Sequence, residues 1–276
     1  MTDLQRILGD LLIVVVLFRR RPEESQAVMS VNEALAGLPA QPRILIYDNS
    51  PLASVVDSSM IYVHDPSNSG VSKAYNQAAV FAHTANKKWM LLLDQDTTIV
   101  PELFRSWCDS QIRHAGSVAF VPRMNDAHGP VSPFVLFMGG GRRMTSRRET
   151  LPLVRCRFVN SGLFIQCEAF EAVGGYDEKI PLDFSDVSFG QRLRKVTDHF
   201  VVVDCTLQHD LSSTVRLSLA EAVRRFGYFC RGARSMRLQS RSGYQYVARA
   251  FLRALHLTLI YRKVSFVRTF FNSVNG

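Results

Sequence analysis

Two carboxylates, Asp94 and Asp96, follow a run of three leucines in the segment "LLLDQDT". A continuous apolar run is typical of a strand that is buried on both faces. Carboxylates at the end of such a strand either cap the next helix or hold a cation. Mg²⁺ and Mn²⁺ take hard oxygen ligands, and Mg²⁺ usually combines one or two carboxylates with substrate phosphates. The D-x-D spacing therefore suits a site for a divalent cation and a diphosphate.

Other polar side chains stand where neighbouring strands are expected to end. Asp48 closes the segment "RILIYD", and His64 and Asp65 close "MIYVHD". Taken singly, these acids have ordinary explanations, because "DNSP" from Asp48 has turn composition and Asp96-Thr97 could cap a helix. Ligands bind beyond the carboxyl ends of strands in open α/β sheets, so the acids together favour a site. We interpret His64 as structural.

Strand-like and helical segments alternate through residue 124. The expected strands cover residues 11–18, 43–48, 60–65, 88–94 and 117–124, and the expected helices cover 21–38, 68–85 and 101–116. This alternation predicts an α/β fold with a Rossmann-like, mainly parallel central sheet flanked by helices. We expect Gln95 to lie where the chain already turns beyond the end of the strand.

Composition narrows the class of protein. The 276 residues, 47% apolar and 21% charged, suit one large domain or one domain with an extension. Five scattered cysteines without a C-x-x-C argue against a disulfide framework or zinc site, which favours the cytoplasm. The apolar run "LLIVVVLF" is far shorter than the roughly 20 residues that span a bilayer. The glycine-rich loops of P-loop and dinucleotide-binding enzymes are absent from the sequence.

The positive charge is concentrated near the C-terminus. Residues 211–276 hold 12 Arg and Lys against one acid, Glu221, whereas the other 210 residues hold 21 basic and 23 acidic residues. We therefore predict a main domain over residues 1–212 and a basic, amphipathic helical extension over 213–276.

Two apolar stripes at helical spacing support the predicted extension. They comprise Leu219, Val223, Phe226, Cys230 and Ala233, then Val247, Ala250, Ala254 and Leu257. Arg249 and Arg253 occupy other positions of the second helix. Helices with apolar and cationic faces lie on anionic membrane surfaces, so we hypothesise peripheral attachment to the inner face of the cell membrane. The alternative is that the stripes pack on the main domain and the arginines are solvated.

Six segments give a family resemblance. In chain order they are "YDNS", "NSGVSKAYNQA", "LLLDQDT", "NSGLFI", "GGYDEKIPLDFSDVSFGQRLR" and "QHD", within about residues 11–212. This order resembles the inverting GT-A glycosyltransferases of family 2, and "DQD" is similar to the branch that uses dTDP-L-rhamnose. The resemblance implies a GT-A fold and transfer of a sugar, expected to be L-rhamnose from dTDP-L-rhamnose. The expected acceptor is a hydroxyl of a glycan or lipid-linked acceptor in bacterial surface polysaccharide synthesis.

The resemblance also assigns roles to individual residues. The nucleotide-sugar donor would contact Asp48, Asn68, Gly70, Lys73, Asn76, Asp94, Gln95 and Gly162. Mg²⁺ or Mn²⁺ would be held by Asp96 and His209. Asp186 would be the general base, with Asp183 as the other acid of the same motif. A position near a helix N-terminus would favour the ionised form of Asp186.

Three further interpretations concern segments and classes outside these roles. The glycines of "FMGGGRRM" (137–144) suggest a flexible connection whose arginines could meet the acceptor. A metal-dependent nucleotidyltransferase would also pair acids around a metal, but a glycine-rich basic signature near the first strand is absent from the sequence. A non-enzymatic nucleic-acid binder would need only the basic extension. We expect no nucleic-acid partner.

Overall fold

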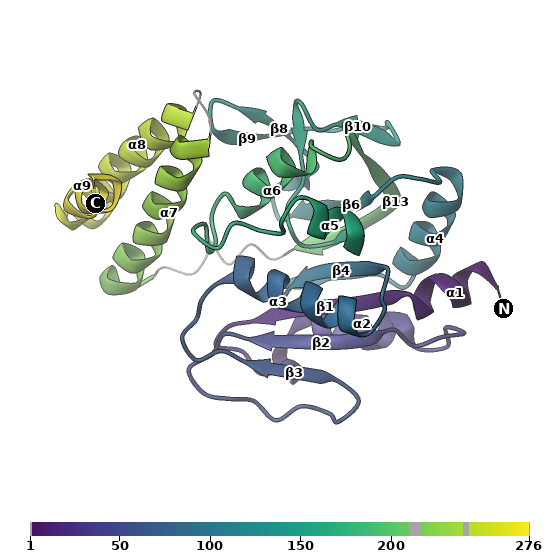
Figure 1. Cartoon of the computed structure of the whole chain (residues 1–276). Coiled ribbons are helices and arrows are strands. Elements are labelled where there is room, and N and C mark those ends of the chain that lie inside the picture. Colours follow the sequence, from purple (N-terminus) through teal and green to yellow (C-terminus); the bar gives the residue numbers. More distant parts are fainter. Residues whose placement is uncertain (1, 210–216, 240–242, 276) are drawn as a thin grey trace.

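The computed structural model of the chain describes residues 2–209, 217–239 and 243–275 (Figure 1). The helices are α1 (Asp3–Gly9), η1 (Pro22–Glu24), α2 (Gln26–Leu35), α3 (Val71–Thr84), α4 (Leu103–Arg113), α5 (Cys167–Ala172), α6 (Ser185–Leu193), α7 (Leu219–Gln239), α8 (Tyr244–Tyr261) and α9 (Ser265–Asn275). The predicted boundary between residues 212 and 213 lies outside the described residues.

The strands follow the same chain order. They are β1 (Leu11–Leu17), β2 (Arg43–Asp48), β3 (Ile61–His64), β4 (Trp89–Asp94), β5 (Thr97–Thr98), β6 (Ala119–Asp126), β7 (Gly129–Ser132), β8 (Phe134–Phe137), β9 (Gly140–Arg143), β10 (Thr150–Pro152), β11 (Cys156–Arg157), β12 (Leu163–Gln166) and β13 (His199–His209). Ten of them form one sheet of order β10-β13-β6-β12-β4-β1-β2-β3, to which β5 and β7 add at β13 and β6.

Six strands of this sheet run in one direction. β3, β2, β1 and β4 are mutually parallel, and β6 and β13 are parallel to each other. Between these groups, β12 is antiparallel to both β4 and β6, so β6 and β13 share the direction of β1. The carboxyl ends of all six strands therefore lie along one edge, which we call the carboxyl edge.

The sheet is covered on both faces, and β1 shows why its sequence is apolar throughout. Leu12, Val14 and Val16 join the core cluster that includes α3, α5 and α6. The alternate residues, including Ile13 and Val15, join the cluster that includes α1, α2 and α4. Because successive side chains of a strand point to opposite faces, burial on both faces requires a continuous apolar run. The predicted α/β fold is confirmed.

The C-terminal helices α7, α8 and α9 pack together at the end of the molecule opposite α1 (Figure 1). Their shared core includes Phe226, Ala250 and Phe266, and it also takes in Ile180 and Val187 from the chain around the start of α6. The extension and the main domain therefore share one apolar cluster.

The apolar stripes of the extension face this cluster. Phe226, Cys230 and Ala233 of α7 and Ala250 and Ala254 of α8 are buried. These side chains stabilise the three-helix unit by burying apolar surface. The hypothesis that these stripes face a membrane is therefore wrong.

The interpretation of residues 137–144 as a flexible connection is also wrong. β8 and β9 form an antiparallel hairpin, and β11 pairs with β8 on its other side. Gly139 has φ +72°, and an added Cβ there would lie 3.2 Å from the Tyr246 ring. At Gly140 a Cβ would lie 2.1 Å from Nη1 of Arg249. The glycines let α8 approach the hairpin closely.

Candidate active site

The D-x-D segment forms a turn at the carboxyl edge. β4 ends at Asp94, residues 95 and 96 turn, and β5 begins at Thr97, so Gln95 lies at a turn as predicted. The Gln95 side chain accepts a hydrogen bond of 2.8 Å from the Phe18 amide. Its carbonyl accepts one of 3.0 Å from Ser25 Oγ, which also caps α2. The structure thus directs Gln95 toward the backbone after β1.

Asp94 is fixed by two partners from other elements. The Tyr75 hydroxyl of α3 donates to Asp94 Oδ1 at 3.0 Å. The Asp94 amide donates to Ser161 Oγ at 2.9 Å, and Ser161 shares a 2.6 Å hydrogen bond with Thr97. The end of β4 is therefore held by α3 on one side and by the segment before β12 on the other.

Asp96 and His209, the two residues to which the resemblance assigns the cation, lie side by side. His209 Nδ1 is 3.5 Å from Asp96 Oδ1 and 2.8 Å from Thr97 Oγ1. Burial and the charge of Asp94 raise the pKa of Asp96, against lowering effects from His209 and Arg20. A cation between these groups would offset the cost of burying adjacent carboxylates.

The residues present fit a divalent cation that is completed by a ligand. Over the described part of the chain, no group of three or more His, Cys, Asp or Glu side chains is placed to hold a metal ion. Asp96 and His209 would supply two ligands, and His209 Nδ1 lies within contact distance of both Thr97 Oγ1 and Asp96 Oδ1. Mg²⁺ commonly binds through one or two carboxylates plus substrate phosphates and water, so a two-residue protein site is sufficient.

Asp48 is fully buried at the end of β2. Its Oδ1 accepts from the Ser50 amide at 2.9 Å, and its Oδ2 accepts from Ser54 Oγ at 3.0 Å and the Tyr62 hydroxyl at 2.8 Å. These bonds organise the segment after β2. Contact of Asp48 with a donor stays a prediction.

Asn68 and Gly70 shape the start of α3. Asn68 has φ +50°, and Gly70 has φ +95° and ψ 174°, a region that is essentially restricted to glycine. The Val71 amide donates to the Pro181 carbonyl at 2.9 Å, and Ser72 Oγ donates to the Ile180 carbonyl. Gly70 thus permits α3 to dock against the chain that leads into α6.

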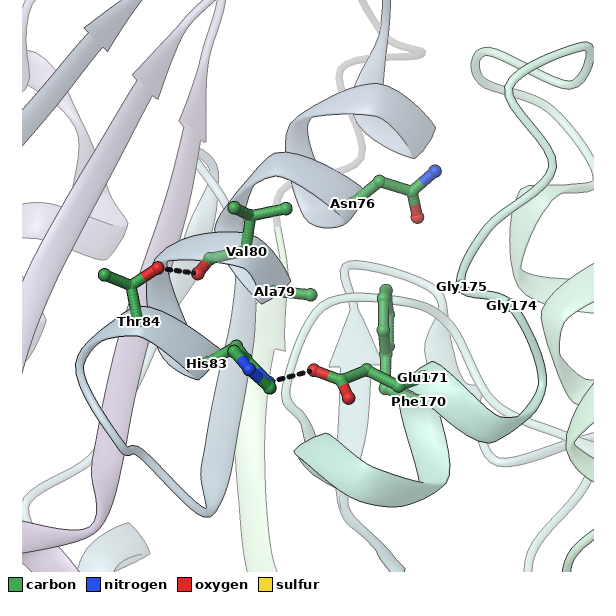
Figure 2. Close-up of a pocket in the computed structure, with 9 residues that line it drawn as sticks. All are labelled: Asn76, Ala79, Val80, His83, Thr84, Phe170, Glu171, Gly174 and Gly175. Carbon is green, nitrogen blue, oxygen red and sulfur yellow. Dashed lines mark hydrogen bonds and ion pairs between the residues drawn. The ribbon is translucent and has the colours of Figure 1, made fainter.

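Asn76 and Lys73 differ in their surroundings. Asn76 donates to the Tyr176 carbonyl and to Glu178, each at 3.0 Å, and accepts from the Tyr176 amide at 2.8 Å. Figure 2 shows Asn76 turned toward Gly175. Lys73 is half-buried, and its side chain has neither an ion pair nor a hydrogen bond to another residue that the structure describes. The Asn76 side chain is thus occupied within the protein, whereas the Lys73 ammonium group is free to bind a ligand.

The hollow in Figure 2, of about 490 Å³, is separate from the acids. It lies between α3 and α5 and is lined by residues that include His83 and Glu171, whose side chains are 3.2 Å apart. Asp94, Asp96 and Asp186 do not line it. We therefore place the candidate site at the carboxyl edge and not in this hollow.

Gly162 and Asn160 connect β12 to the site. Gly162 has φ +84°, and its amide donates to the Leu92 carbonyl at 2.7 Å. Asn160 donates to Ser185 Oγ at 2.8 Å and accepts from the Tyr176 hydroxyl at 2.9 Å. These bonds tie the start of α6 to the centre of the sheet.

Asp186 lies in the first turn of α6 and accepts a hydrogen bond of 2.7 Å from the Val187 amide. Burial raises the pKa of Asp186 to about 6, more than this bond lowers it, and the charges of Asp183 and Asp94 raise it further. Asp186 therefore lies at a helix N-terminus as predicted, but desolvation outweighs the hydrogen bond that the helix terminus donates. A carboxylate with this pKa is ionised at neutral pH and basic enough to take a proton.

Asp183 is engaged elsewhere. Both of its oxygens accept from Arg225 of α7, with Nη2 at 3.1 Å from Oδ1. Because Arg225 engages both oxygens, the Asp183 carboxylate is already occupied by a partner within the protein. Of the two acids in the motif, Asp186 is therefore the better candidate for a base.

Sequence reasoning missed two tyrosines and Arg225. The rings of Tyr75 and Tyr176 are 5.2 Å apart, and burial followed by the charge of Asp94 raises the pKa of Tyr75 well above its usual range. Burial and the charges of Asp186 and Asp94 do the same for Tyr176. Both phenols stay protonated between the acids. Tyr75 lies in "SKAYNQA", but nothing local showed which face of the helix it occupies.

Comparisons with known proteins identify the fold. No family model and no curated protein matches the chain. S. aureus TarS 1–349 in complex with UDP matches with a TM-score of 0.53 and 11% identity, covering 96% of this chain and 90% of that chain. GalNAc-T7 with UDP, GalNAc and Mn²⁺ matches with a TM-score of 0.50 and 12% identity, covering 73% and 44%.

A longer TarS structure matches with a TM-score of 0.50 and 12% identity over 81% of this chain, which spans only 43% of that one. At these identities the similarity establishes the fold, and the predicted GT-A architecture is confirmed.

Replacing Gly70 by alanine should destabilise the protein more than replacing Gly37. Both glycines have positive φ, +95° and +77°, but a Cβ at Gly70 would lie 2.3 Å from the Pro181 carbonyl oxygen. At Gly37 a Cβ would meet nothing within 4 Å. We expect Gly70→Ala to lose about 1–3 kcal/mol more unfolding free energy in urea titrations. Equal losses would show that the close contact with Pro181 is not needed.

Proposed function

We propose that this protein is an inverting glycosyltransferase that moves a sugar from a nucleotide diphosphate donor to an acceptor hydroxyl. The observation that carries the proposal is the placement of Asp186, with a pKa of about 6, within electrostatic range of Asp94 at the edge that also holds Asp96. It is supported by the fold, since the matching TarS structure contains UDP and the GalNAc-T7 structure contains UDP, GalNAc and Mn²⁺.

In the proposed reaction, Asp186 takes the proton of the acceptor hydroxyl as that oxygen attacks the anomeric carbon. The bond from the anomeric carbon to the phosphate oxygen breaks, and the nucleoside diphosphate leaves with the bonding electrons. One displacement inverts the configuration. The chain's own contribution is to place the base and to hold it through the Asn160–Ser185 and Tyr176–Asn160 hydrogen bonds.

Mg²⁺ or Mn²⁺ is the proposed cofactor, held by Asp96 and His209. When bound, a divalent cation acts as a Lewis acid that neutralises charge on the departing diphosphate. The proposal is supported by the contacts of His209 Nδ1 with Thr97 and Asp96, which hold these side chains next to each other.

We propose dTDP-L-rhamnose as the donor, because "DQD" and the surrounding motifs resemble the rhamnosyltransferase branch. The proposed acceptor is a glycan or lipid-linked acceptor of surface polysaccharide synthesis. The test is release of free nucleoside diphosphate with Mg²⁺ from dTDP-L-rhamnose and from UDP-GlcNAc and UDP-GalNAc as comparison donors. Release of pyrophosphate from a nucleoside triphosphate would instead support the nucleotidyltransferase alternative.

We also propose that the extension attaches this cytoplasmic protein to an anionic membrane surface. No helix in the described part of the chain is long and apolar enough to cross a membrane. The outer face of α8 exposes Leu252, Leu255 and Leu259 by 65%, 41% and 76%. These residues recur at helical spacing, and the twelve basic residues of segment 211–276 would be attracted by anionic lipids.

Asp96→Ala should abolish metal-dependent donor binding, because it removes the charged ligand of the proposed cation. Isothermal titration with dTDP and Mn²⁺ measures this. Asp109→Ala on the surface of α4 makes the same substitution at an exposed residue and should leave the affinity unchanged. Unchanged affinity in Asp96→Ala would remove Asp96 from the cation site.

Asp186→Asn should cut turnover by about 10²-fold or more while leaving dTDP affinity nearly intact, because asparagine cannot accept the proton. In the wild type, protonation of Asp186 should make kcat/KM fall about tenfold per pH unit below about pH 6. A loss of less than about threefold in the variant would make Asp183 the better candidate for the base.

The wild type should sediment with anionic vesicles, less so at high salt, and not with neutral ones. Leu252→Gln combined with Leu259→Gln should weaken this binding, because it removes exposed apolar contacts. Met29→Gln, an exposed position on α2, serves as the control and should bind as the wild type does. Equal recovery in the supernatant with both vesicle types at low salt would contradict membrane attachment.

A further inference from the structure

Two arginines of the C-terminal helices interact with Asp183, three residues before the candidate base, and a third arginine, Arg249, lies near one of them. Arg225 of α7 forms a two-point ion pair with Asp183. Arg253 of α8 interacts electrostatically with Asp183, Arg225 and Arg249. We call Arg225, Arg249 and Arg253 the arginine cluster. With Asp183 as its partner, the cluster keeps an excess of two positive charges.

Packing holds the cluster together against its own repulsion. The Arg253 guanidinium lies over the Phe229 ring, 4.3 Å from its centroid. The Arg249 guanidinium rests on Gly140, where an added Cβ would overlap it. Arg249 and Arg253 are four residues apart on α8, a spacing at which like charges destabilise a helix. Fixed like charges of this kind are the arrangement expected of an anion-binding site.

The cluster is open to solvent. Arg249 and Arg253 are exposed, and the Arg225 side chain is 40% exposed. The side chains of Arg249 and Arg253 form no ion pair or hydrogen bond with another residue in the described ranges 2–209, 217–239 and 243–275. Protein nevertheless covers part of the Arg253 side chain, and this burial lowers the pKa of its guanidinium group. A ligand can therefore reach guanidinium groups that the protein itself leaves uncompensated.

The cluster lies on the acceptor side of the proposed chemistry. Asp183 is three residues before Asp186, and its negative charge raises the pKa of Asp186. Between them, the Phe184 ring packs against Phe229 of α7 at a centroid distance of 4.7 Å. The arginine whose charge acts on Asp96 is a different one, Arg20 after β1. The cluster thus borders the base, whereas the proposed diphosphate site has its own positive group.

We propose that the arginine cluster binds a phosphate group carried by the acceptor. This inference rests on the proposed function, since it takes Asp186 as the base that the acceptor hydroxyl must reach. Guanidinium groups match phosphate oxygens in two-point hydrogen bonds, and a phosphate monoester carries about −1.5 to −2 charges at pH 7. A negative charge of this size would neutralise the excess of about two positive charges in the arginine cluster. The substrate class is therefore a phosphate-bearing acceptor.

Binding of inorganic phosphate tests the cluster without any donor. The unfolding temperature would be measured with EDTA at pH 8, in phosphate, acetate and chloride of equal ionic strength. Phosphate should raise the unfolding temperature of the wild type above its value in chloride, and acetate should raise it less. Arg249→Gln combined with Arg253→Gln should lose this rise, because the unpaired charges are removed while the Arg225–Asp183 pair is kept.

Two controls separate the cluster from general basicity and from the donor site. Arg224→Gln combined with Arg268→Gln removes the same charge from α7 and α9 and should keep the phosphate effect. The Arg249/Arg253 double variant should bind dTDP with Mn²⁺ as tightly as the wild type, and Asp96→Ala should keep the phosphate effect.

A persistent phosphate effect in the Arg249/Arg253 variant would overturn the proposal, as would its absence in the wild type or an equal loss in the control pair. An acetate effect equal to that of phosphate would overturn phosphate as the ligand class. Weakened dTDP binding in the Arg249/Arg253 variant would assign these arginines to the donor. Failure of the proposed function alone would appear as absent nucleoside diphosphate release while phosphate still binds at the cluster.

Discussion

Strands that run in one direction bring their carboxyl ends, and the acids that follow them, to a single edge where water solvates the charges poorly. The structure meets the cost of this desolvation in two ways. Asp48 and Asp94 receive hydrogen bonds from hydroxyl and amide groups. Asp96 and Asp186 keep raised pKa values instead. In Asp96 and Asp186 desolvation outweighs the interactions that lower the pKa, and these are the two acids to which we assign cation binding and proton transfer.

The elements around this edge are joined by the same few contacts. Tyr75 extends from α3 to Asp94, and Asn160 links Tyr176 to the start of α6. The extension takes part as well, because Arg225 holds Asp183 and its α7 neighbour Glu221 lies 3.2 Å from Arg19 after β1. The C-terminal helices are therefore joined to the chain before the candidate base and to the chain after β1, and their proposed contact with a membrane would bring the candidate site close to that surface.

Sequence patterns predicted what local physics determines. The continuous apolar run of β1 and the acids at the ends of β2 and β4 placed a sheet edge and its polar side chains correctly. Side chains whose roles depend on distant partners could not be placed. Asn76 is of a residue type that often binds ligands, yet its side chain donates a hydrogen bond to Tyr176, one hundred residues away. Residues 137–144 have the composition of a loop, and only the approach of α8 explains their glycines.

A crystal structure with dTDP and Mn²⁺, with the cation located by its anomalous scattering, tests the central claim most directly. The account predicts one Mn²⁺ at the carboxyl edge, coordinated by Asp96, by His209 and by oxygens of the dTDP diphosphate. Asp186 should face the side from which the acceptor enters. A bound dTDP whose diphosphate lies away from Asp96 and His209, or a Mn²⁺ coordinated elsewhere, would contradict the assignment of this edge as the site of sugar transfer.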